Sequence, residues 1–192
     1  HRGRIEAELL LGQFSFAVRD AARITAFVLP AHPDAYSTIQ GGYLERLKAS
    51  PDSIPALMGL SFSRWWNFDY AQAIHYLNRL LDVAPNSLYG NLFRGSSRML
   101  SGKTRAEGIV DLERGISLSP ASAHVRFIAA DAYTYGQFDA NRALTEANLA
   151  LSWGLDTPRL HAILAVVYTA IGNVGAAALE TKIHFDQVTT EL

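Results

Sequence analysis

The clearest repeated unit of the sequence spans residues 54–87 and reads IPALMGLSFSRWWNFDYAQAIHYLNRLLDVAPNS. Its first half, from Leu57 to Trp66, is apolar around nearly the whole circumference of a helix. Asn67-Phe68-Asp69 then suits a turn, and Pro85 near the end cannot continue a helix. The second half has small or apolar residues at helical positions i, i+4 and i+7, which are Ala73, Leu77 and Leu80. The stretch therefore predicts a helix, a turn, a second helix and a stop.

The same pattern recurs along the chain at intervals of about 35 residues. Small residues then fall at one position of each expected second helix, namely Ala73, Gly108, Ala143 and, in the last repeat, Ala178 or its neighbour Ala177. A small residue suits this position because two helices that cross at close range leave no room for a larger side chain. One such helix pair cannot bury its own apolar faces, so successive pairs must stack to form a continuous core. The sequence therefore predicts an all-α solenoid of antiparallel helix pairs.

The period divides most of the chain into four repeats, over residues 54–87, 88–122, 123–157 and 158–192. We interpret residues 1–53 as an N-terminal helical cap, within which residues 4–29 read as a truncated repeat. Pro33-Asp34 suits a helix start in this cap, and Gly41-Gly42 is expected to interrupt the apolar face that follows.

Composition excludes several classes of protein. Hydrophobic residues make up 49% and charged residues 18% of the 192 residues, which is too apolar for a disordered chain. The net charge is −1, so no nucleic-acid partner is expected. Because cysteine is absent, disulfides, thiolate metal sites and cysteine nucleophiles are excluded. We expect a soluble protein, and the sequence does not distinguish the cytoplasm from the periplasm.

Motifs that would carry chemistry are incomplete. Ser101-Gly102-Lys103-Thr104 resembles the end of a phosphate-binding loop, but Ser97 stands where that loop has its first glycine. The six histidines lack the spacing of a zinc site, so they are expected to serve packing or the surface. The segment Leu160–Leu179 is long enough to cross a membrane, but Gly172 and Gly175 favour two helices joined by a turn. We expect no catalysis, metal, cofactor or membrane span.

The repeats resemble the tetratricopeptide repeat family in length and residue types. In residues 54–87 the resemblance rests on apolar and small residues of both helices and on the final proline, namely Leu57, Leu60, Ser61, Tyr70, Ala73, Leu77, Leu80 and Pro85. Arg64 departs from the family pattern, which has tyrosine there, whereas Tyr133 and Tyr168 follow it in later repeats. The resemblance covers residues 54–192 and implies a right-handed superhelical solenoid that binds a protein or peptide partner.

In this family the first helix of each repeat lines a concave groove, and the resemblance implies the same here. The first helices also carry more large apolar side chains than packing on the second helix requires. Such side chains suit a groove that holds an extended peptide or a helix. The candidate groove residues are Met58, Phe62, Trp65, Trp66, Phe93, Arg94, Arg98, Asp131, Tyr135 and Val166. The alternative is that residues 4–53 or a neighbouring repeat cover these side chains.

Some members of the family grip a C-terminal carboxylate with lysine and asparagine on successive first helices. Met58 and Phe62 occupy the matching positions here, which favours an apolar peptide, a partner helix or self-association. The apolar segment 161–171 makes the C-terminal repeat a candidate surface for homo-oligomers. We therefore expect a protein–protein interaction scaffold without catalysis of its own.

Two alternative functions stay open. The chain starts at His1 without a methionine, so it could be the regulatory or substrate-recruiting repeat region of a larger enzyme whose catalytic domain lies upstream. It could instead hold a small ligand, or act as an enzyme, in a pocket among Arg94, Arg98, Asp131 and Tyr135. Asp131 lies inside an apolar helix, and we expect it to contact a ligand or to pair across repeats with Arg94, Arg98 or Arg126.

Overall fold

The computed structural model describes residues 33–190, except for the side chains of residues 33–39, Trp66, Gln137 and Thr190. The chain forms two compact units, His1–Gly90 and Asn91–Leu192. Every regular element within residues 33–190 is helical, which confirms the all-α class. The truncated repeat predicted over residues 4–29 lies outside the described residues.

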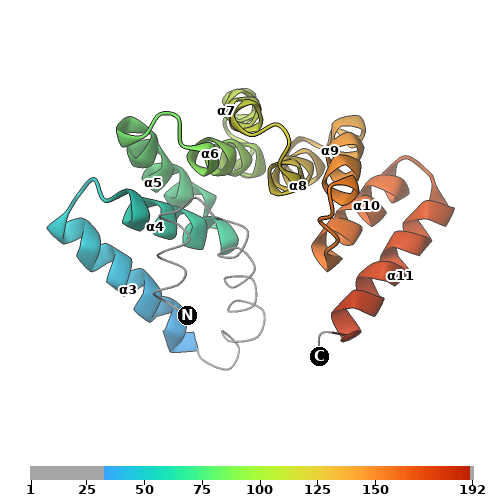
Figure 1. Cartoon of the computed structure of the whole chain (residues 1–192), viewed down its shortest axis with the longest axis horizontal. Helices are drawn as coiled ribbons and strands as arrows, with labels where there is room; N and C mark the ends of the chain where they lie inside the picture. Colours follow the sequence, from blue (N-terminus) through green and yellow to red (C-terminus); the bar gives the residue numbers. More distant parts are fainter. Residues whose placement is uncertain (1–32, 191–192) are drawn as a thin grey trace. The chain divides into compact units, whose positions relative to one another are not determined.

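The first unit contains α3 (Pro33–Ala49), α4 (Ile54–Trp66) and α5 (Tyr70–Val83). α4 and α5 lie side by side as an antiparallel pair joined by a short turn (Figure 1). Pro55 lies in the first turn of α4, where its missing N–H breaks no helical hydrogen bond. α5 begins at a cap in which the Asp69 carboxylate accepts a hydrogen bond of 3.3 Å from the backbone N–H of Gln72.

α3 is one continuous helix, so the interruption expected at Gly41-Gly42 does not occur. Packing explains the difference, because Tyr43 and Leu47 on α3 are only 5% and 8% exposed. A Cβ atom added to Gly59 of α4 would lie 2.4 Å from the Tyr43 ring, so this ring fills the space beside the glycine. Burial of these side chains offsets a helix-propensity cost of about 1 kcal/mol for each glycine in α3.

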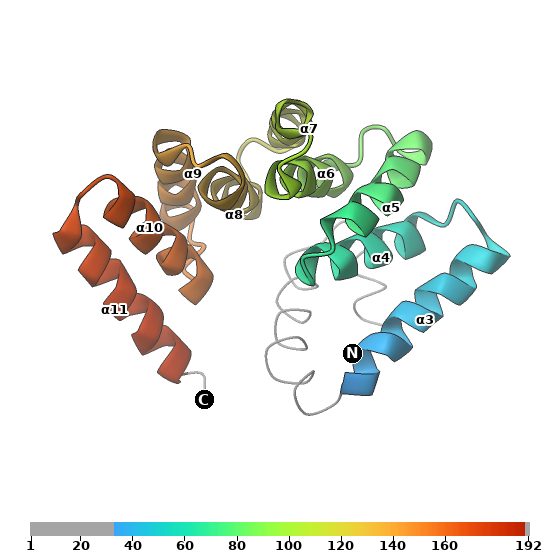
Figure 2. The ribbon, with the colours of Figure 1, turned by 180° about the vertical axis from the view of Figure 1, so that it is seen from behind.

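The second unit contains α7 (Arg105–Leu118), α8 (Ala123–Ala132), α9 (Ala140–Ser152), α10 (Pro158–Ala170) and α11 (Val174–Thr190). α6 (Leu88–Ser101) begins before the boundary between the units, and the π-helical turn η2 (Tyr133–Gln137) extends α8. α8 packs on α9, and α10 packs on α11, as antiparallel pairs (Figure 2). A side chain caps the start of each of α8, α9 and α10 by accepting a hydrogen bond from the backbone N–H of the third residue after it. The capping residues are Ser122, Asp139 and Thr157.

Small residues lie where paired helices cross, as the repeat pattern predicts. Ala73 of α5 and Ala143 of α9 are completely buried. A Cβ atom added to Gly95 of α6 would lie 2.6 Å from the Leu112 backbone nitrogen and 2.7 Å from the Gly108 carbonyl oxygen, so α6 and α7 meet backbone to backbone.

In the last repeat the sequence leaves Ala177 and Ala178 open, and the structure buries Ala177. Ala177 is 8% exposed whereas Ala178 is exposed, so the buried small residue lies one position earlier than a constant 35-residue period requires. The π-helical turn η2 explains the difference, because a π-helical turn inserts one extra residue into a helix. α10 contains no such turn.

The turns between paired helices each contain one residue with a positive φ, namely Phe68, Gly102, Phe138 and Gly172. Gly102 is therefore accounted for by the turn between α6 and α7, without a bound phosphate. Gly136, which the sequence places in the same kind of turn, has a different role. A Cβ atom added to it would lie 2.7 Å from the Met99 Cβ, so this glycine allows η2 to approach α6 closely.

The apolar segment Leu160–Leu179 is divided by the turn at residues 171–173 into parts of α10 and α11. Across residues 33–190 we find no helix that is both long enough and apolar enough to span a bilayer.

Candidate functional site

A buried acid on α8 lies at the centre of the first candidate site. Asp131 is 4% exposed and accepts hydrogen bonds from Arg159 of α10, at 3.1 Å from Nε and 2.7 Å from Nη2. The Arg159 guanidinium also lies over the Tyr135 ring, 5.0 Å from the ring centroid. The first helices of two successive repeats are thus joined by a salt bridge and a cation–π contact.

Burial controls the ionisation of this site. It raises the pKa of Asp131, and the charge and hydrogen bond of Arg159 act against that rise. Burial also raises the pKa of the Tyr135 hydroxyl, again opposed by Arg159. Arg159 is thus the group that favours the ionised form of Asp131, and the two side chains hold each other by two hydrogen bonds.

The partner of Asp131 differs from the sequence prediction, which named Arg94, Arg98 or Arg126. Arg94 and Arg98 both bind Asp111 of α7, at 2.7 Å and 2.6 Å. Arg126 binds Glu146 of α9 at 2.9 Å. Each of these arginines is satisfied by an acid on the second helix of its own repeat, which leaves Arg159 of the next repeat for Asp131.

These ion pairs divide the four residues of the suggested ligand pocket into two groups with different partners. Arg94 and Arg98 share Asp111, whereas Asp131 and Tyr135 both contact Arg159.

Several of the apolar groove candidates are buried. Met58 and Phe62 are 7% and 9% exposed and Phe93 is 1% exposed. These three side chains are therefore covered by other parts of the chain, which was the alternative to an open groove. Trp65 is half-buried and stacks on Phe62, with ring centroids 6.1 Å apart. The side chain of Trp66 lies outside the described residues.

Two of the predicted groove residues remain exposed, and one of them, Tyr135, contacts Arg159. Tyr135 is 42% and Val166 is 39% exposed. Arg159 and Val166 are seven residues apart on α10, so they lie on the same face of that helix. We call the surface formed by Tyr135, Arg159 and Val166 the first-helix face.

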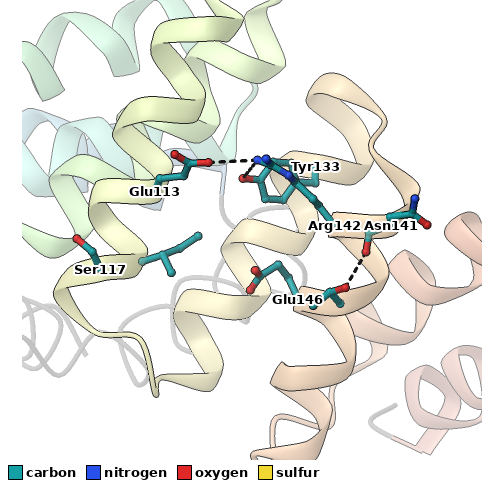
Figure 3. A pocket seen from close by; sticks show the side chains of 8 residues that line it. Glu113, Ser117, Tyr133, Asn141, Arg142 and Glu146 are labelled. Carbon is teal, nitrogen blue, oxygen red and sulfur yellow. Dashed lines mark hydrogen bonds and ion pairs between the residues drawn. The ribbon is translucent and has the colours of Figure 1, made fainter.

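A pocket that the sequence does not predict lies between the second helices of successive repeats, α7 and α9 (Figure 3). It is open to solvent, has a volume of about 420 Å³ and is lined by Glu113, Ile116, Ser117, Tyr133, Asn141, Arg142, Thr145 and Glu146. Arg142 donates hydrogen bonds to Glu113 at 3.2 Å and to the Tyr133 hydroxyl at 3.1 Å. Glu113 and Arg142 are 29 residues apart in the chain, so no local motif connects them.

A second cluster, which the sequence does not predict, surrounds a buried histidine of the last repeat. His161 is 3% exposed, with Nδ1 2.5 Å from the Glu180 carboxylate of α11 and Nε2 2.9 Å from the Asp156 carboxylate in the turn before α10. Gln187 of α11 donates a hydrogen bond of 2.5 Å to the same Asp156 oxygen. We call these four residues the His161 cluster. In the described part of the chain, no group of three or more histidine, aspartate and glutamate side chains is arranged to hold a metal ion.

Comparison with known proteins identifies the fold. No protein-family model and no curated protein sequence matches the chain at a significant level. The tetratricopeptide repeat protein TTC0263 from Thermus thermophilus aligns with a TM-score of 0.65 and 19% identity, over 83% of this chain and 87% of its own. A tetratricopeptide repeat protein from Parabacteroides merdae gives a TM-score of 0.66 and 14% identity, over 96% and 80%. MamA gives 0.60 and 17% identity, over 81% and 90%. The chain therefore has the fold of tetratricopeptide repeat proteins.

Proposed function

We propose that this chain is a protein–protein interaction scaffold that binds a peptide or a partner helix on its first-helix face and has no catalysis of its own. The fold supports the proposal, because stacked helix pairs present an extended surface for binding. The observation that carries it is the exposure of two apolar side chains, Tyr135 and Val166, on first helices that Arg159 and the buried Asp131 join.

The chemistry of this face suits a partner that presents an apolar side chain. Tyr135 offers a large ring with only two side-chain torsions, so fixing it on binding costs little conformational entropy. Val166 adds apolar area. The charge of Arg159 is balanced by Asp131, so an acidic partner would gain little from it. We therefore place the main contact on Tyr135 and Val166, with polar contacts around them.

Peptide capture by the purified full chain tests this proposal. The probe is an array of peptides with apolar residues at extended or helical spacing, applied to the unsubstituted chain and to Tyr135→Ala and Val166→Glu. Both substitutions should weaken capture by about tenfold or more, since each removes or charges a central apolar contact. Val110→Glu is the matched control, because Val110 is 66% exposed on the second helix α7. Equal capture by all four proteins would contradict the proposal.

The pocket between α7 and α9 favours a second candidate, a helical domain that binds a small polar ligand. A ligand there would contact Arg142 and Glu113, so its binding would survive Tyr135→Ala. A repeat region that recruits substrate for a larger enzyme would instead use the first-helix face, and its partner would be a segment of that enzyme or of its substrate.

We also propose self-association through the C-terminal repeat. Much of the apolar segment 161–171 is buried, including Ile163 and Leu164, so α10 offers little of the surface. The more exposed apolar side chains of this repeat lie on α11, where Leu179 and Phe185 are 57% and 60% exposed, against 39% for Val166 of α10.

A further inference from the structure

The last three repeats share an ion pair between their two helices. On each of the second helices α7, α9 and α11, one acidic side chain binds a basic side chain on the first helix of the same repeat. The pairs are Asp111 with Arg94, Glu146 with Arg126, and Glu180 with His161. Arg126 and His161 stand at equivalent positions of successive repeats. The last repeat thus has a titratable group where the repeat before it has a permanent charge.

The geometry of the His161 cluster requires a proton on both ring nitrogens. Each nitrogen faces a carboxylate oxygen, and an ionised carboxylate can only accept a hydrogen bond. Only the imidazolium form donates from both nitrogens. In the neutral form, one ring nitrogen would direct a lone pair at Asp156 or Glu180 inside a buried site, which is unfavourable.

The cluster connects three parts of the last repeat. Asp156 belongs to the turn before α10, His161 to α10 itself, and Glu180 and Gln187 to α11. A second contact between these helices joins His184 Nδ1 and the Pro158 carbonyl at 2.8 Å. Loss of the His161 contacts would therefore remove one of the two polar contacts named here between α10 and α11, that of His161 with Glu180. It would also separate Asp156 from α10, so that Gln187 of α11 would hold a carboxylate no longer tied to His161.

The other charged and titratable groups on the elements packed against α10 have partners elsewhere. On α8 and α9 these are Asp131 with Arg159, Arg126 with Glu146, and Arg142 with Glu113 and the Tyr133 hydroxyl. Tyr135 of η2 lies under Arg159, and Lys182 of α11 binds Asp186. His124 of α8 and His184 of α11 are the other histidines on these elements, so each needs a control substitution.

We propose that the His161 cluster makes the docking of α11 on α10 depend on pH, with α11 held while His161 is protonated and opening more often once it is neutral. α11 is the terminal helix of the described chain, and its outer face is exposed, so it can open without disturbing α8 or α9. Opening would uncover the buried apolar side of α10, including Leu164 and Val167. Surface available for association would therefore increase with pH.

The direction of the pH dependence follows from the pKa values. Burial by itself lowers the pKa of His161, but hydrogen bonds to Glu180 and Asp156 and their charges outweigh it, so the pKa is raised. A raised pKa contributes stability that is fully present below the unfolded value of about 6.5 and is lost as pH rises through the folded pKa. The pKa of Asp156 is lowered, first by its hydrogen bond with His161, so its contribution is lost only in acid.

Two measurements on the full chain test the proposal, at a concentration where sedimentation shows a single species. NMR titration gives the pKa of His161, and hydrogen exchange gives the protection of α11 amides between about pH 5 and pH 8, corrected for intrinsic exchange. The pKa should exceed about 6.5, and the opening equilibrium of α11 should rise by up to about tenfold per pH unit as His161 deprotonates. Protection of α11 that stays constant through the titration would overturn the proposal.

Substitutions assign the effect to His161. His161→Arg should give α11 protection that no longer varies with pH, because the equivalent Arg126 keeps its charge. Asp156→Asn is a milder test at a residue whose side chain is 61% exposed, and it should lower the pKa of His161 and shift the opening to lower pH. His184→Gln and His124→Gln should leave the pH dependence unchanged. Loss of the dependence in either of these two controls, or its persistence in His161→Arg, would refute the assignment.

Discussion

Glycine has opposite effects at two positions of this chain. At Gly95 a side chain would meet the backbone of α7, at 2.6 Å from the Leu112 nitrogen and 2.7 Å from the Gly108 oxygen. Backbone atoms inside a helix cannot move aside as a flexible side chain can. At Gly175, in the first turn of α11, a Cβ atom would have no neighbour within 4 Å.

These surroundings predict opposite changes in stability. Gly95→Ala should lower the free energy of unfolding by about 1–3 kcal/mol, because α6 and α7 must separate to admit the methyl group. Gly175→Ala should raise it by up to about 1 kcal/mol, because alanine favours the helix and meets nothing. Urea denaturation of both variants checks the prediction. Similar effects of the two substitutions would show that α6 and α7 do not meet at Gly95.

At the scale of single residues, the sequence predicts positions that depend on packing better than positions that depend on backbone shape. The buried Ala73 and Ala143 could be predicted, because a helix crossing needs a small residue at a regular interval. Phe68 and Phe138 could not be predicted as residues with positive φ, since that conformation usually selects glycine. For the last repeat the sequence left both Ala177 and Ala178 open, because η2 adds a residue that no periodic pattern records.

At the scale of helices, the ion pairs show what a pattern can and cannot determine. That Asp131 pairs across repeats could be predicted, because an acid within an apolar helix needs a cation. Its partner could not be identified, since the chain offers several arginines and the choice depends on which of them already have an acid nearby. Arg126 has Glu146, which leaves Asp131 to Arg159.

Removal of the Arg159 charge should therefore destabilise the chain through Asp131. Arg159→Gln leaves a carboxylate that is 4% exposed without its cation, and we expect a loss of about 1–3 kcal/mol. This is less than for a fully buried pair because the Arg159 side chain is 54% exposed and solvent weakens its interaction. Urea denaturation measures the loss, and Arg159→Gln combined with Asp131→Asn should recover part of it.

The pH dependence of this variant has a definite sign. Without Arg159, burial raises the pKa of Asp131 unopposed, so the folded state binds a proton that the unfolded state has released. The stability of Arg159→Gln should then fall as pH rises through the folded pKa of Asp131, and its deficit relative to the unsubstituted chain should be larger at neutral pH than in acid. An equal deficit at both pH values would show that Asp131 is not the source of the loss.

At the scale of the whole molecule, the repeat pattern predicts how interior helices are covered but not what covers an end. Leu151 of α9 is half-buried, and α9 packs on α10. Phe185 stands at the equivalent position of α11, and it is 60% exposed because no helix follows α11 within residues 33–190. Leu179 adds a second exposed apolar side chain on α11.

We propose that a second copy of α11 covers this surface, because a two-fold contact would place the same apolar residues against each other. The net charge of −1 gives little repulsion between copies. We therefore expect reversible dimerisation that Phe185→Glu and Leu179→Glu abolish, with changes in unfolding free energy within about 0.5 kcal/mol because both residues lie at the surface. Val110→Glu, at an exposed valine of α7, is the control and should leave dimerisation intact. Sedimentation velocity over a range of concentrations measures the dimerisation of each protein. An unsubstituted chain that stays monomeric throughout would contradict the dimer. Loss of dimerisation in Val110→Glu as well would show that the contact does not depend on α11.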